Sequence, residues 1–120
     1  MVQYQSSALP DYAPPPLHES FAALADQTRI AFIERLRRAD ASITDLADQA
    51  AITLTGARKH VKVLESAGLV TTRKEGRTRM CSLGPRRLER EADWIGTYQR
   101  TLEERLDRLG TLLETLKEEA

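Results

Sequence analysis

Apolar side chains in the first half of the chain recur every three or four residues, the spacing that places them on one face of a helix. Three such stripes occur: Leu17, Phe21 and Leu24; Ile30, Ile33 and Leu36; and Leu54, Ala57, Val61 and Leu64. We therefore expect three amphipathic helices whose stripes face a core.

Capping residues indicate where these helices begin and end. Asp26 can cap the second helix, and Thr53 can cap the helix that carries the third stripe. The segment 42–45, "SITD", matches a capping box and predicts a further short helix through about Ala50. Gly68 is well placed to end the last of these helices. A short helix, a tight turn and a longer helix thus follow one another.

The pattern changes after this point to short β-type segments. "LVTTRK" and "TRMCSL", joined by "EGR" with Gly76, predict a β-hairpin. Gly84 and Pro85 are expected to start a long helix, because proline suits the first helical turn. Its apolar residues recur at sevens, a repeat that keeps one face towards a partner helix. They are Leu88, Ile95, Leu102, Leu109 and Leu116.

This order of elements predicts a fold that is mainly α with a small β-hairpin: a winged helix-turn-helix that dimerises through its terminal helices. Residues 1–16, with four prolines, predict an extended arm. Residues 17–84 form the expected DNA-binding core, and residues 85–120 the long dimerisation helix.

Charge changes this picture only when it is counted by region. Residues 53–90 carry 10 basic and 3 acidic side chains, whereas residues 1–52 carry 4 and 7, and residues 91–120 carry 4 and 8. The neutral total therefore hides a basic middle. A basic helix face is commonly only a solvated face, but here it follows a helix-turn and precedes a basic hairpin.

We therefore predict double-stranded DNA as a partner, contacted by the helix-turn-helix and by the hairpin. Arg58 and Lys59 are expected at base edges, and Arg77 at phosphates or in the minor groove. The predicted contact residues are Thr44, Thr53, Leu54, Thr55, Arg58, Lys59, His60, Lys62, Arg73, Lys74, Arg77 and Arg79.

A homodimer is the second predicted assembly, because the long apolar stripe needs a cover. Trp94 and Tyr98 lie one helical turn apart and could belong to that interface or line an effector pocket. The predicted interface residues are Leu17, Phe21, Leu24, Leu88, Trp94, Ile95, Tyr98, Leu102, Leu106, Leu109, Leu112, Leu113 and Leu116.

Together these segments resemble the ArsR-type transcriptional repressors. "FAALADQTRIAFIERLR" resembles that family's opening helices, "TDLADQAAITLTGARKHVKVLESAGLV" its helix-turn-helix and "RKEGRTRMCSL" its wing. "ADWIGTYQRTLEERLDRL" further resembles a subgroup often encoded beside small START-like proteins. The resemblance implies an obligate homodimer, joined through its first and last helices, that represses by occupying an operator.

Two departures from the family bear on mechanism. Metal-sensing members carry a cysteine pair on the third helix or histidines and carboxylates on the last, but "ITDLADQA" has neither cysteine nor histidine, and no histidine follows His60. We therefore expect no metal site and no cofactor. Ala51 stands where such turns often have glycine, which would cost up to about 1 kcal/mol if its backbone is left-handed.

Two single residues have alternative interpretations. His60 could donate to a phosphate or base, or pack at the edge of the core. Cys81 is a candidate redox switch on the wing, although a lone thiol in a strand is more often packing. For the effector we rank an unidentified small molecule or partner protein first, oxidation of Cys81 second and a metal last.

Other classes of protein fit less well. The chain has no glycine-rich phosphate loop or motif-embedded nucleophile, and His18 and His60 fall on separate predicted helices, so we do not expect an enzyme. Residues 1–17 have no basic start and no apolar run, so we expect them to be neither a signal peptide nor a membrane span. The single cysteine suits a reducing compartment, and together these features predict a cytoplasmic protein. The alternative function is a helical adaptor that binds a partner through its long last helix.

Overall fold

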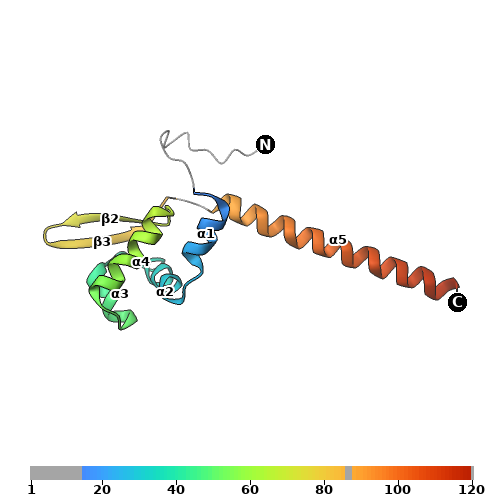
Figure 1. Ribbon diagram of the computed structural model, residues 1–120, viewed down its shortest axis with the longest axis horizontal. Coiled ribbons are helices and arrows are strands. Elements are labelled where there is room, and N and C mark those ends of the chain that lie inside the picture. Colours follow the sequence, from blue (N-terminus) through green and yellow to red (C-terminus); the bar gives the residue numbers. More distant parts are fainter. Residues whose placement is uncertain (1–14, 86–87, 120) are drawn as a thin grey trace. The chain divides into compact units, whose positions relative to one another are not determined.

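The computed structural model describes residues 15–85 and 88–119, so most of the predicted arm lies outside the described residues. It divides into two units, Met1–Arg87 and Leu88–Ala120 (Figure 1). In chain order the elements are α1 (Leu17–Leu24), α2 (Gln27–Leu36), β1 (Ala41–Ser42), α3 (Ile43–Ala50), α4 (Leu54–Ser66), β2 (Val70–Glu75), β3 (Thr78–Leu83) and α5 (Glu89–Glu119).

The three predicted helix caps are confirmed. The Asp26 carboxylate accepts from the Arg29 backbone N–H, the Ser42 hydroxyl from that of Asp45, and the Thr53 hydroxyl from that of Gly56. Each bond satisfies a backbone donor that a helix start would otherwise leave without a partner. The sequence alone thus fixes the starts of α2, α3 and α4.

Gly68 follows the C-cap of α4 and terminates this helix, as predicted. Its φ is 77°, and the N–H groups of Gly68 and Leu69 donate to the carbonyls of Glu65 and Leu64. This is a Schellman motif, which favours glycine because the backbone is left-handed there. Gly84 is needed for a different reason: a Cβ on it would lie 2.4 Å from the Gly68 carbonyl oxygen. Two glycines therefore let the end of the sheet approach the end of α4.

The predicted hairpin forms, but it belongs to a three-stranded antiparallel sheet of order β1-β3-β2. The extra strand is only two residues long, with Ala41 opposite Cys81 and Ser42 opposite Met80. Ser42 thus pairs with the sheet and caps α3 at once. Figure 1 shows the hairpin of β2 and β3 extending beyond the helices of its unit. The start of α3 is consequently tied to the wing.

The core of the first unit contains four of the ten predicted stripe residues, Leu36, Ala57, Val61 and Leu64, and two of the others need correction. Ala57, Val61 and Leu64 are buried as expected, but Leu54 is 38% exposed because it opens α4 at the edge of the unit. Ile30 is 43% exposed, and Phe32 is buried with Leu36 instead. The stripe predicted for α2 was therefore wrong by part of a turn.

The second unit is the helix α5, 31 residues long. The predicted helix start at Gly84 and Pro85 was wrong: Leu88 has a φ of 58°, in the left-handed region, and α5 begins only at Glu89. Leu88 still accepts from the Ala92 backbone N–H, as a capping position does. No helix among residues 15–85 and 88–119 is long and apolar enough to cross a membrane.

Candidate nucleic-acid interface

Helix α4 presents a basic face away from the core. Burial of Ala57, Val61 and Leu64 fixes the rotation of the helix, so the side chains between them point outward. Thr55, Arg58, Lys59, Lys62 and Ser66 are all exposed. Within the described residues none of these cations has an ion pair with a carboxylate. The face predicted from the sequence is therefore present, and its charge is unneutralised.

The turn before α4 has the backbone conformation that makes Ala51 unfavourable. Its φ and ψ are 56° and 43°, left-handed, and its N–H donates to carbonyls at the end of α3. A side chain there costs up to about 1 kcal/mol relative to glycine. Thr53 follows as the cap of α4, and the predicted contact residues Thr44 and Leu54 are exposed at the starts of α3 and α4. The backbone at Ala51 is therefore strained, at the position where the sequence predicted it.

His60 is placed against α2, which supports the packing interpretation. Its Nδ1 lies 3.0 Å from Nη1 of Arg29 and 3.8 Å from Oδ2 of Asp26, and its ring meets Phe32 edge to face. A guanidinium only donates, so this nitrogen accepts and the ring proton is on Nε2. Arg29 also donates to the carbonyls of Ala22 and Ala23. These contacts favour packing at the edge of the core, and a DNA contact of His60 stays a prediction.

The wing has two faces with different charge. Lys74 lies directly opposite Arg79 in the strand register, so their side chains share a face. Like charges directly opposite each other destabilise an antiparallel pair. Arg77 is exposed in the turn beside Gly76, whose φ is 63°. Within the part of the chain that the structure describes, no carboxylate forms an ion pair with these three cations.

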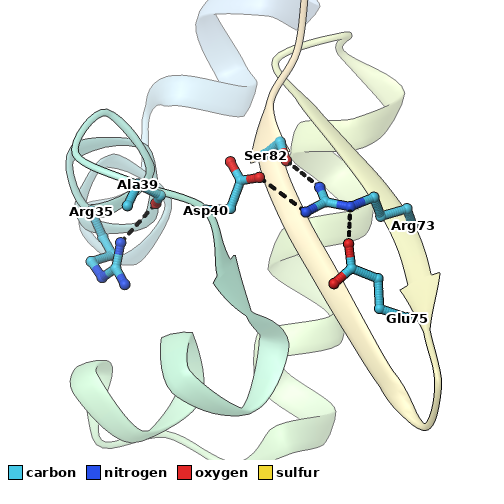
Figure 2. Close-up of polar contacts among 6 residues, drawn as sticks. All are labelled: Arg35, Ala39, Asp40, Arg73, Glu75 and Ser82. Carbon is cyan, nitrogen blue, oxygen red and sulfur yellow. Dashed lines mark hydrogen bonds and ion pairs between the residues drawn. The ribbon is translucent and has the colours of Figure 1, made fainter.

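Arg73, on the other face of the hairpin, is occupied by neighbours (Figure 2). Its guanidinium donates to Oδ2 of Asp40 at 3.1 Å, to Oγ of Ser82 at 2.7 Å and to Oε2 of Glu75. The Ser82 hydroxyl and Arg73 hold the pKa of Asp40 below its ordinary value, and Glu75 and Asp40 raise the pKa of Arg73. Nothing in the sequence pattern distinguishes Arg73 from the other wing cations.

Cys81 is fully buried in β3. Burial, with a smaller contribution from Glu65, raises the pKa of its thiol to about 11. A reactive cysteine needs thiolate character and access, and Cys81 lacks both. The position supports packing over the candidate redox switch.

The predicted interface residues are mostly uncovered in the single chain. On α1, Ser20 and Ala23 are buried while Leu17, Phe21 and Leu24 are half-buried. On α5, Ile95, Leu102, Leu109 and the other stripe residues are exposed. Trp94 and Tyr98 are exposed as well, and their rings stack with the ring centroids 5.9 Å apart. No group of three or more His, Cys, Asp or Glu side chains within residues 15–85 and 88–119 could hold a metal ion.

Comparisons with known proteins agree with this geometry. A family model described as a helix-turn-helix domain matches residues 24–73. The HTH-type transcriptional regulator Rv2034 of Mycobacterium tuberculosis is 36% identical over 66 residues, covering 55% of this chain and 62% of that protein. The match thus spans less than two thirds of that relative's own length.

Solved structures extend the comparison. A crystal structure of the ArsR family transcriptional regulator RHA00566 is 34% identical, with a TM-score of 0.65, and the match covers 72% of this chain and 96% of that one. The solution structure of a homodimeric winged helix-turn-helix domain from Mycobacterium bovis is 23% identical, with a TM-score of 0.56, over 87% of this chain and 90% of that one. At this lower identity the likeness shows the fold.

The element order, the three-stranded sheet and these matches define a winged helix-turn-helix protein, mainly helical with a small antiparallel sheet. The chain belongs to the ArsR family of transcriptional regulators. This is a family of DNA-binding proteins that are not enzymes.

Proposed function

We propose that this protein is a homodimeric repressor that blocks an inverted-repeat operator. The observation that carries the proposal is the outward face of α4, where Arg58, Lys59 and Lys62 are exposed without an ion-paired carboxylate in the described residues. A recognition helix in the major groove presents its first turns to base edges, and arginine donates to both acceptors of guanine. Arg58 and Lys59, with Thr55, are the base-contacting residues we propose.

The wing supplies the proposed contacts with the DNA backbone. Lys74 and Arg79 repel each other across the strands in the free protein, and a phosphate between them would relieve that repulsion. Arg77 at the tip extends the same basic surface. Contacts of this kind hold the protein on any sequence and make binding depend on salt.

The homodimer is supported by two observations. The apolar stripe of α5 is exposed along most of the helix, and a continuous apolar face of that length favours burial against a second helix. The Mycobacterium bovis domain of the same fold is described as homodimeric. We propose that α5 and the half-exposed stripe of α1 form the interface, with Trp94 and Tyr98 inside it.

The effector we propose is a small molecule or a partner protein. The third helix lacks the cysteines of metal-sensing relatives, and the last lacks their histidines. The burial of Cys81 and the high pKa of its thiol disfavour oxidation as the signal.

Base contact and backbone contact can be separated with Arg58→Ala and Arg77→Ala. Arg58→Ala should lose roughly 1 to 3 kcal/mol per half-site and relax the preference at particular base pairs. Arg77→Ala should weaken all duplexes more evenly and lower the slope of log affinity against log salt by about 0.9 per phosphate contact. Both variants would be titrated against operator, scrambled and point-changed duplexes at several salt concentrations.

Circular dichroism and sedimentation would first establish that both variants are folded and have the assembly state of the wild type. If Arg58→Ala retained both affinity and base preference, α4 would not be the base-contacting element. Salt-insensitive binding of a protein partner through α5, without DNA binding, would instead support the adaptor.

A further inference from the structure

The guanidinium of Arg73 donates a hydrogen bond from each of its three nitrogen atoms. Its Nη2, Nη1 and Nε atoms donate to Asp40, Ser82 and Glu75 respectively. Two of these acceptors are carboxylates, so the positive charge is compensated locally. For Arg73 to bind a DNA phosphate, the phosphate would have to displace these acceptors or approach two negative charges.

Asp40, the acceptor furthest from Arg73 in sequence, shows which parts of the fold these hydrogen bonds connect. Asp40 lies 33 residues from Arg73 and directly precedes β1, the strand of Ala41 and Ser42. Ser42 then caps α3, the first helix of the helix-turn-helix. The contact between Arg73 and Asp40 therefore ties the outer strand of the hairpin to the chain that enters the helix-turn-helix, across β3 (Figure 2).

The two faces of the hairpin carry different residues and can therefore serve different functions. Strand alternation places Arg73 and Ser82 on one face, and Lys74 and Arg79 on the other with Thr72. The Thr72 hydroxyl donates to Glu65 of α4, so this second face is the one turned towards that helix. Lys74 and Arg79, for which the described part of the chain offers no ion-paired carboxylate, lie on the side of α4. Arg73, whose charge is compensated, lies on the opposite side.

We propose that Arg73 is a positioning residue of the wing rather than a DNA contact. It holds the hairpin at a fixed angle to the start of α3, so that Lys74, Arg77 and Arg79 meet the backbone while α4 lies in the groove. This inference rests on the proposed DNA-binding function and assigns one of its basic residues a different role. Asp40 and Ser82 are the acceptors through which Arg73 acts.

A double-mutant cycle of Arg73→Ala and Asp40→Asn distinguishes the two roles. Asp40→Asn alone is ambiguous, since removal of a negative charge favours DNA in either case, but the coupling between the two changes is not. If Arg73 positions the wing through Asp40, Arg73→Ala weakens operator binding by roughly threefold to tenfold in the wild type. In the Asp40→Asn background the further loss should be much smaller.

Two readouts separate positioning from direct contact. The salt slope should stay unchanged in Arg73→Ala, whereas Arg77→Ala, the matched control on the same hairpin, should lower it by about 0.9. Arg73→Lys should lose as much affinity as Arg73→Ala, because lysine keeps the charge but not the planar fork that fits three acceptors. Circular dichroism and thermal unfolding of each variant confirm that the fold is retained.

The opposite results would overturn the proposal. These are a larger effect of Arg73→Ala in the Asp40→Asn background, a reduced salt slope, full rescue by Arg73→Lys, or no effect on affinity at all. Failure of the DNA-binding function itself looks different: the wild type would then not bind the duplexes, or Arg58→Ala and Arg77→Ala, measured in the same titrations, would also leave its affinity unchanged.

Discussion

Helices α4 and α5 carry apolar stripes that look alike in the sequence but differ in the structure. On α4, Ala57 and Leu64 are 0% exposed, because α2, α3 and the sheet pack against them within the unit. On α5, Leu102 is 47% exposed and Leu109 is 52% exposed. Periodicity therefore identifies the residues that share a face, but it does not identify what covers that face.

The difference gives each stripe a separate thermodynamic signature. A stripe covered within its own unit stabilises the fold at any protein concentration. A stripe that needs a second chain contributes only when that chain is bound, so its effect depends on concentration. The following substitutions test this distinction, beginning with the largest expected effect.

Leu64→Ala should lower the free energy of unfolding by about 2–5 kcal/mol, since it opens a cavity in the core of the first unit. Val63→Ala, the adjacent position with an exposed side chain, is the control and should change it by much less. Chemical denaturation at several protein concentrations would measure both. An effect of Leu64→Ala that vanished at high concentration would show that this stripe also depends on a partner.

Leu109→Glu should raise the dimer dissociation constant by roughly two orders of magnitude, because it places two charges in an apolar seam. Thr111→Glu adds the same charge on the opposite side of α5 and should leave the assembly intact. Sedimentation velocity over a concentration series measures both. A wild-type chain that remained monomeric at micromolar concentration would contradict the proposed interface.

Ala51→Gly should raise the free energy of unfolding by up to about 1 kcal/mol, because the backbone of this turn is left-handed. Ala50→Gly, one residue earlier in α3, should lower it by a similar amount, since glycine is unfavourable in a helix. In thermal unfolding, the melting temperature should rise in Ala51→Gly and fall in Ala50→Gly relative to the wild type. Equal destabilisation by both changes would show that the turn is not strained.

Chemical modification of Cys81 should have the smallest effect, because the thiol is buried in the core of the first unit. An alkylating reagent at neutral pH should label the thiol only after unfolding, and mild peroxide should leave operator affinity unchanged. Burial favours the neutral thiol over the thiolate in the folded protein, which raises the pKa of Cys81 and adds a pH-dependent contribution to stability. This contribution is complete below the ordinary thiol pKa and is lost as the pH rises towards 11. Rapid labelling of the folded protein would instead support Cys81 as a redox switch.

Local signals predicted the fold well where the chemistry is local. Asp26, Ser42, Thr53 and Gly68 each act within a few residues along the chain, so their caps could be identified from spacing alone. The two-residue strand β1 could not be identified, because so short a segment has no periodicity and forms only through pairing with β3, far along the chain.

The candidate site shows the same limit. The outward face of α4 followed from its buried stripe, but the roles of His60 and Arg73 depend on Arg29 and Asp40, which lie 31 and 33 residues away. A basic residue in a basic segment carries no sign of whether its charge is already compensated. Only the packed structure separates Arg73 from Lys74.

Selection of bound sequences from random double-stranded DNA with the purified chain tests the central claim most directly. Two identical subunits should enrich an imperfect inverted repeat whose half-sites lie about one helical turn or a multiple of it apart. The stoichiometry at saturation should be two chains per duplex. A single unpaired half-site bound by one chain, or no enrichment over random sequence, would contradict the account of a homodimeric regulator that contacts bases through α4.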